Sequence, residues 1–245
     1  AYTTINKSTD YFNTKLYTGN GSTNAITGVG FQPDFTWIKS RTEGYGHSLF
    51  DAVRGVTKAI ASEGTGAEYT FSTGLTAFGS DGFTLGSGTV VNNNSQNHAS
   101  WNWKANGAGS ANTDGSISST VSASATSGFS VVTYTGNNTN GATVGHGLGV
   151  IPSMVIVKKL SATRDWMVKH KDLTSNHNIS LNTTAAQFNS PVNGWISNLT
   201  SNQTISFSIG SSDIDNVNQG AQQYVAYCFA DVQGYSKFGS YTGNG

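Results

Sequence analysis

Short runs in which bulky apolar residues alternate with polar ones recur along the chain, and many of them are followed by turn residues such as glycine, asparagine or aspartate. In residues 35–41, Phe35 and Trp37 fall on one face, while Thr36 and Ile38 fall on the other. A period of two with large side chains is typical of a half-buried β-strand. The pattern therefore predicts an all-β chain of short strands joined by polar turns.

The same pattern places the strands along the whole chain. We expect them within 14–18, 35–41, 47–50, 68–71, 75–78, 83–86 and 99–104, and then within 129–134, 150–159, 165–168, 178–181, 204–210 and 223–230. Asp81-Gly82 predicts a hairpin turn, because glycine supplies the positive φ. Residues 47–61 come close to helical spacing, but Gly55 would cost a helix interior about 1 kcal/mol. We expect a strand, a turn through Arg54-Gly55, and then an irregular or short helical piece.

A four-residue marker, Tyr-Thr-Gly-Asn, occurs three times. Its tyrosine and glycine positions are Tyr17 and Gly19, Tyr134 and Gly136, and Tyr241 and Gly243. The segments after the first two copies follow in the same order, which predicts a tandem repeat. Antiparallel sandwiches with short strands and glycine-rich turns fit this pattern, of jelly-roll, concanavalin-like or immunoglobulin-like type.

The repeat divides the chain into predicted units. We expect a first β-sandwich unit at 1–108, a linker rich in Gly, Ser, Ala and Thr at 109–126, and a second β-sandwich unit at 127–236. The linker has room for one edge strand at 116–123. Residues 237–245 would be the first strand of a third unit, because the third marker falls at the last residues of the sequence.

Composition narrows the classes of function. Charged residues make up 11%, about half of the roughly 25% usual for soluble domains. With 13 basic and 13 acidic residues, no net field would attract nucleic acid. No apolar run approaches the ~18 residues of a membrane span, and the first residues lack a secretory signal pattern. Cys228 is the single cysteine, lies in an apolar run, and is expected to be a core residue.

Several stretches together resemble a known family. They include KLYTGNG, GFQPDFTWIKSR, HSLFDAVRG and FGSDGFTLG in the first part, and VGHGLGVIPSMVIVKK and YVAYCFADVQGYSKFGSYTGNG in the second. They resemble a repeated all-β module of bacteriophage virion and tail-associated proteins, common in phages of marine bacteria. The resemblance covers nearly the whole chain and implies a structural or host-contacting part of a virus particle. It supplies no catalytic residues, and the second part departs from the HSLFDAVRG stretch.

For the candidate catalytic and metal-binding residues, the sequence favours structural roles over chemical ones. The carboxylates considered for a hydrolytic pair are Asp51, Glu63, Glu68, Asp81, Asp213 and Asp215. A glycosidase needs two carboxyl groups about 5 to 9.5 Å apart, and no shared motif brings a pair together. Asp213 and Asp215 could offer oxygen ligands to Ca²⁺, but a polar turn is favoured. The histidine spacing does not predict a zinc site, and His146 is expected in a turn between glycines. No cofactor is expected.

Two aromatic residues are candidates for ligand binding, and one ion pair is a candidate for fixing a loop. Tyr45 and Trp195 fall in predicted loops and are the best candidates for an exposed platform on which a sugar ring could stack. Arg54 is expected to pair with Asp51 across its turn and to fix that loop.

We therefore expect a non-enzymatic virion structural protein of the tail, fibre or particle surface, which acts through assembly and host contact. Its partners would be copies of itself or other virion proteins, and host surface polysaccharide is a further possible partner; nucleic acid and membrane insertion are not expected. The protein would be assembled in the host cytoplasm and located in the virion. The alternatives are a lectin-like receptor-binding protein for host glycans, a cell-surface adhesin fragment and, with least support, a depolymerase.

Overall fold

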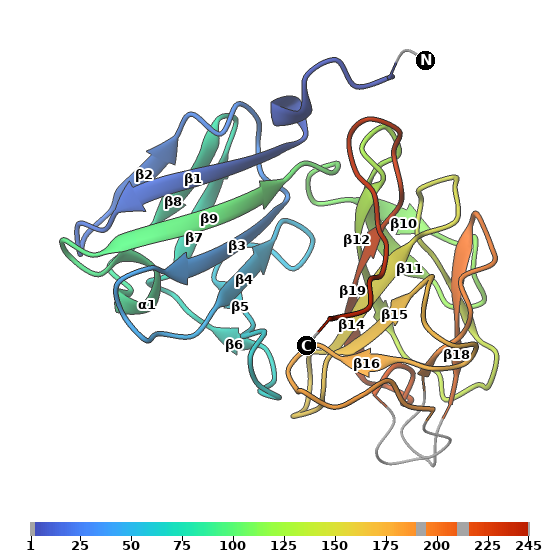
Figure 1. Cartoon of the computed structure of the whole chain (residues 1–245). Coiled ribbons are helices and arrows are strands. Elements are labelled where there is room, and N and C mark those ends of the chain that lie inside the picture. The colour runs from blue at the N-terminus through green and yellow to red at the C-terminus, as the bar shows by residue number, and fades with distance from the viewer. Residues whose placement is uncertain (1–2, 190–194, 210–215, 245) are drawn as a thin grey trace.

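The computed structural model describes residues 3–189, 195–209 and 216–244. It consists of two halves that lie side by side, with the first half on the left of Figure 1 and the second on the right. Apart from the 3-10 turn η1 (Ser8–Asp10) and the short helix α1 (Thr89–Asn92), the elements of the described residues are strands. All of their ladders are antiparallel. The prediction of an all-β sandwich fold is confirmed.

The first half contains a four-stranded sheet, a three-stranded sheet and a two-stranded ribbon. The larger sheet has the order β1-β9-β3-β4, the smaller one β2-β8-β7, and the ribbon pairs β5 with β6. The strands are β1 (Phe12–Thr18), β2 (Asn24–Thr27), β3 (Phe35–Ser40), β4 (Ser48–Asp51), β5 (Lys58–Ala59), β6 (Tyr69–Thr70), β7 (Leu75–Gly79), β8 (Gly82–Leu85) and β9 (Asn97–Trp103).

The second half contains a seven-stranded sheet, β10-β11-β12-β19-β14-β15-β16, and a three-stranded sheet, β13-β18-β17. The strands are β10 (Ser110–Asn112), β11 (Ser119–Ser124), β12 (Phe129–Thr135), β13 (Thr143–Gly145), β14 (Met154–Lys159), β15 (Met167–His170), β16 (Ile179–Ser180), β17 (Trp195–Ile196), β18 (Thr204–Ser208) and β19 (Gln223–Phe229). The strand order β12-β19-β14-β15 in the large sheet corresponds to the order β1-β9-β3-β4 in the first half. In the same way, the order β13-β18-β17 corresponds to β2-β8-β7.

The sheets stack in four layers with a hydrophobic core between each neighbouring pair. One core lies between the two sheets of the first half and includes Ile38, Phe50 and Phe83. A second core lies between the two sheets of the second half. The middle core joins the halves, because Phe35 of β3 and Tyr227 of β19 both belong to it, with ring centroids 4.3 Å apart. Both large sheets are therefore buried on two faces over part of their area.

Alternation along β19 shows how one strand serves two cores. Val225 and Tyr227 belong to the middle core, while Tyr224, Ala226 and Cys228 belong to the core of the second half. Such a strand must be apolar at nearly every position, as the sequence YVAYCF is. The expectation for Cys228 is confirmed, since it is fully buried and burial raises the pKa of its thiol to about 12.

Three stretches differ from the sequence prediction in detail. The residues after Gly55 form turns and then β5, so the irregular alternative holds for the residues before β5 and the short helical alternative is wrong. Residues 109–126 contribute β10 and β11 to the large sheet, where a linker with one edge strand was expected. Residues 237–244 contain no strand, although Phe238 packs against Phe229 at a centroid distance of 6.0 Å. The number of repeat units stays a prediction.

Within the described residues, no helix is both long and apolar enough to cross a lipid bilayer.

Candidate functional site

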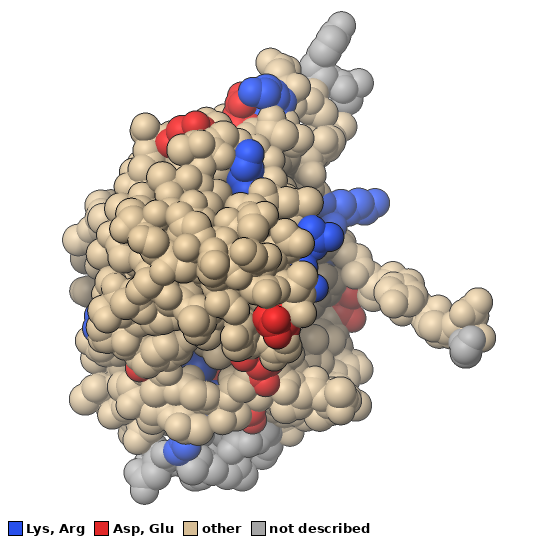
Figure 2. Space-filling model, turned by 90° about the vertical axis from the view of Figure 1, so that its left-hand side faces the viewer, with Lys and Arg blue, Asp and Glu red and all other residues tan. Residues whose placement is uncertain are grey.

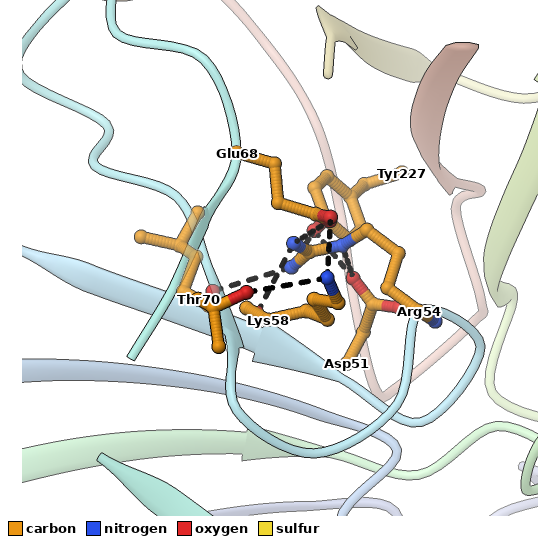
Figure 3. A network of polar contacts seen from close by, with 7 residues as sticks. Asp51, Arg54, Lys58, Glu68, Thr70 and Tyr227 are labelled. Atoms are coloured by element: carbon orange, nitrogen blue, oxygen red, sulfur yellow. Dashed lines mark hydrogen bonds and ion pairs between the residues drawn. The ribbon is translucent and has the colours of Figure 1, made fainter. Parts of the chain in front are cut away.

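A buried network of charged side chains sits where the loop after β4 meets β19 (Figure 3). Arg54 Nε donates to Asp51 Oδ2 at 2.6 Å, and the Arg54 backbone N–H donates to Asp51 Oδ1 at 2.8 Å. The hydroxyl of Tyr227, 176 positions further along the chain, donates to Asp51 Oδ2 at 2.8 Å. The Asp51 and Arg54 side chains are 0% and 3% exposed, so the expected ion pair is present and is shielded from water.

All five N–H donors of the Arg54 guanidinium can be assigned an acceptor. Besides the Nε bond to Asp51, Nη1 donates to the Lys58 carbonyl at 3.2 Å and to Glu68 Oε2 at 3.0 Å. Nη2 donates to the Leu49 carbonyl at 3.2 Å and to the Tyr227 hydroxyl at 3.4 Å. A buried cation with a complete set of acceptors is held in place, so Arg54 ties its loop to β4, β5 and β19.

The network sets the protonation states of Arg54 and Tyr227. Burial alone would lower the pKa of Arg54, but the Asp51 charge and the other acceptors raise it above its ordinary value. Burial raises the pKa of Tyr227 well above its usual range, so this phenol keeps its proton and can donate it to Asp51. Asp51 is therefore paired with a permanent cation. Both of its carboxylate oxygens accept hydrogen bonds from Arg54 or Tyr227, and this arrangement favours a structural role.

The loop between β5 and β6 is also held by the second half. Its Ala61 carbonyl accepts from Trp166 Nε1 at 3.0 Å. The Thr65 carbonyl accepts from the buried Lys158 Nζ at 3.1 Å and from the Arg164 backbone N–H at 2.9 Å. These bonds, together with the Arg54 network, form a polar joint beside the middle core.

A polar cleft of about 440 Å³ opens beside this joint. Arg54 and Glu68 line it from the first half, and side chains of β11, β12 and β19 line it from the second. The latter include Thr120, Thr133, Thr135 and Gln223. The cleft offers hydroxyl, amide and carboxylate groups, which suit a neutral polyhydroxylated ligand better than an anion. Sequence reasoning missed this cleft, because its lining residues come together only in the fold.

The first two marker turns close with the same hydrogen-bond pattern. The Tyr17 hydroxyl donates to the Val91 carbonyl at 2.7 Å, and the Tyr134 hydroxyl donates to the Val217 carbonyl at 2.6 Å. Each ring stacks on its cross-strand neighbour, which is His98 for Tyr17 and Tyr224 for Tyr134. The two tyrosines therefore anchor β1 and β12 to equivalent turns.

A buried asparagine follows each of these valines in the sequence, and its side chain accepts a hydrogen bond from a backbone N–H group of the marker turn. Asn92 Oδ1 accepts from the Asn20 backbone N–H at 3.0 Å, and Asn218 Oδ1 accepts from the Asn137 backbone N–H at 3.0 Å. A Cβ at the marker glycine would lie 2.1 Å from the Asn93 carbonyl oxygen for Gly19. It would lie 2.3 Å from the Gln219 carbonyl oxygen for Gly136. Glycine is needed at both positions because the backbones approach so closely.

Among the residues that the structure describes, the third marker makes no equivalent contacts at its tyrosine or its glycine. Tyr241 is 94% exposed, and a Cβ at Gly243 would meet no atom within 4 Å. The predicted role of this copy as the start of a third unit stays a prediction.

The two predicted platform residues lie in different halves, and no contact links them. Tyr45 is half-buried in the loop between β3 and β4, where its carbonyl accepts from Lys39 Nζ at 2.6 Å. Trp195 belongs to β17, paired with Ser208, although the sequence placed it in a loop. Its indole Nε1 is buried and its ring is partly exposed. Their role in glycan binding stays a prediction.

The other candidate polar residues have structural partners or fall outside the description. Asp81 accepts from the backbone N–H groups of Gly28 and Gly30, and these bonds lower the pKa of its carboxyl. Glu63 accepts from the His47 backbone N–H at 3.0 Å. Asp213 and Asp215 lie outside the described residues. Within the described ranges, no three His, Cys, Asp or Glu side chains gather as a metal site. His146 is buried beside its turn, and burial lowers its pKa.

Taken together, the layered antiparallel sheets and the buried polar joint define a β-sandwich protein whose polar groups are mainly used to hold its own chain. The family model that matches residues 7–245 is described as a domain of unknown function, DUF7483, and the chain belongs to that family. No curated protein matches the chain, and no solved structure does.

We predict that Arg54→Met lowers the free energy of unfolding by about 3–5 kcal/mol, because it leaves the buried Asp51 charge unpaired. The double variant Asp51→Leu/Arg54→Met should recover part of that loss. Lys58→Met is the matched control, since Lys58 is 42% exposed and its pairing with Glu68 should contribute no more than about 1 kcal/mol. Urea unfolding measures all three. An Arg54→Met cost as small as that of Lys58→Met would contradict a structural role for the network.

Proposed function

We propose that this chain is a non-enzymatic structural module of a bacteriophage particle, built on one sandwich plan used twice, and that it acts through assembly and host contact. The observation that carries the proposal is the rigid joint between the halves, in which carboxylates that could serve chemistry bind the protein's own groups. The sequence resemblance to virion modules points to the same role. The matching strand orders and marker turns support the repeated plan.

The outer surface supports association without strong charge. Figure 2 shows the face formed by the first half, where a broad uncharged area is flanked by a few basic and acidic side chains. Surfaces of this kind suit contact with other proteins or with neutral glycans and do not suit nucleic acid.

The edge strand β1 offers a place for assembly. It pairs with β9 on one side and forms the edge of its sheet on the other. Leu16 in the middle of this strand is 61% exposed. A seven-residue edge with an exposed leucine is a template for pairing with a strand of another chain, since its outward backbone groups need partners.

An antibody raised against the purified chain should label intact virus particles in electron micrographs, because a structural module is retained in the particle. The same antibody after adsorption with the purified chain is the control. Label that appears in infected-cell extracts and never on washed particles would contradict the proposal.

The chain should associate in a concentration-dependent way, and Leu16→Lys should shift it toward monomer, because a lysine on an edge strand opposes strand pairing. Multi-angle light scattering over a wide concentration range measures this. Val150→Lys changes an apolar residue of similar exposure, 47%, away from the edge and should leave association unchanged. A wild-type chain that stays monomeric throughout the range would count against assembly through β1.

A second function, recognition of a host glycan, is favoured by the polar cleft. Sugar hydroxyl groups are bound by side chains of the kinds found there, namely threonine hydroxyls, the Gln223 amide and the Glu68 carboxylate. The predicted platform residues Tyr45 and Trp195 lie apart from this lining, so the two locations can be tested separately.

If the cleft binds sugars, Thr133→Val should reduce glycan-array signals at least about tenfold, because it removes a hydrogen-bonding group from a polar site. Tyr45→Ala and Trp195→Ala test the aromatic platform on the same array. Loss of signal in these two variants alone would move the site away from the cleft. Absence of any sugar signal from the wild-type chain would remove the glycan function.

A further inference from the structure

An apolar cavity of about 240 Å³ lies between the two large sheets, inside the joint of the halves. The first half contributes residues of β3, β4 and β9, and the second half contributes residues of β14 and β19 and of the segments beyond β14 and β19. The principal lining side chains are Phe35, Trp37, Trp103, Ile156, Trp166 and Tyr227. The cavity is a separate space from the polar cleft, because the lining residues of the two differ.

In three of the lining rings, the polar atom donates a hydrogen bond to a residue that does not line the cavity. Trp37 Nε1 donates to His47 Nδ1 at 2.7 Å, and Trp166 Nε1 donates to the Ala61 carbonyl at 3.0 Å. The Tyr227 hydroxyl donates to Asp51, as described above. These rings therefore present carbon to the cavity. A water molecule needs two to four polar partners, which this lining does not provide.

The size of the cavity favours an occupant. An apolar cavity of about 150 Å³ in another protein stays dry and accepts a benzene ring. Unfilled space in a core loses contact energy, so a cavity of this size between two halves favours any state in which it is filled. Flat aromatic walls suit a ring better than a branched chain, because rings stack face to face or edge to face.

The entrance is lined by two side chains that are not part of a core strand. Leu181 follows β16 and is 38% exposed. Phe238 lies beyond β19, where its backbone N–H donates to Asp231 Oδ1 at 2.7 Å and its ring approaches His170 at 6.4 Å. Both side chains also line the cavity, so they mark the side on which it faces the surface.

We propose that this cavity is a binding site for a small, uncharged aromatic molecule of one or two rings, held between the halves. Its walls come from both halves, so a bound ring adds contacts across the middle core. Binding should therefore stabilise the contact between the two halves. This site is independent of the proposed function, because assembly would use the outer surface and glycan contact would use the polar cleft, whose lining residues differ from those of the cavity.

The two methionines of the chain provide a direct test. Met154 lines the cavity, whereas Met167 is buried in the core of the second half. In a protein with ¹³C-labelled methionine methyl groups, toluene and naphthalene should shift the Met154 signal through ring currents and leave the Met167 signal in place. Both compounds should also raise the midpoint of thermal unfolding in a saturable way. Benzoate, which carries a charge, should do neither.

Leu181→Trp should fill the entrance and weaken binding of toluene at least about tenfold, since an overfilled site loses space for the ligand. Val150→Trp adds the same ring at an exposed position that does not line the cavity and should bind as the wild type does. Ile156→Phe is a second filling variant. An unchanged Met167 signal shows that each variant is folded.

The site would be disproved if the Met154 signal did not respond up to the solubility limit of both compounds. Equal shifts of Met154 and Met167 would disprove it as well, because they would indicate general loosening of the cores. Binding of benzoate as tight as that of toluene would overturn the apolar class of ligand. Unchanged toluene binding in both folded filling variants would place the ligand elsewhere.

Discussion

The burial of both faces of the two large sheets is the constraint on which the rest of the molecule depends. A sheet that is covered on one face can be polar on the other, but residues 155–157 of β14 and most of β19 face cores on both sides and must be apolar. The middle core therefore couples the halves, and its rim must satisfy any polar group that burial removes from water. The Arg54 network meets this need, because one guanidinium bonds to the carbonyls and carboxylates around it and to Tyr227 across the joint.

Much of the fold could be predicted from the sequence. Alternation identified strands such as β3 and β9, and Asp81-Gly82 identified the hairpin between β7 and β8. The short helix α1 was missed, because four residues are too few to show a helical period. The helical alternative for the residues after Gly55 was wrong because their apolar positions serve tertiary contacts, as with Ile60 in the first core. Local periodicity cannot distinguish a helical face from residues placed individually against a sheet.

The candidate site was predicted only where its members are close in sequence. Asp51 and Arg54 were paired correctly from their spacing of three residues. Tyr227 could not be assigned, because it belongs to a run that looked uniformly apolar and is 176 positions from Asp51. The polar cleft and the apolar cavity were hidden for the same reason. Trp37 and Trp103 looked like ordinary core residues of one sandwich, although their face is shared between two halves.

The position of Cys228 has a practical consequence. Its thiol is enclosed between β12 and β14, and its raised pKa leaves almost no thiolate at neutral pH, so maleimide reagents would find no nucleophile on the native chain. A cysteine placed by mutation on the exterior would then be the only group that accepts a dye or spin label. Distances between two such labels, one on each half, could be measured in solution without first deleting the native sulfur.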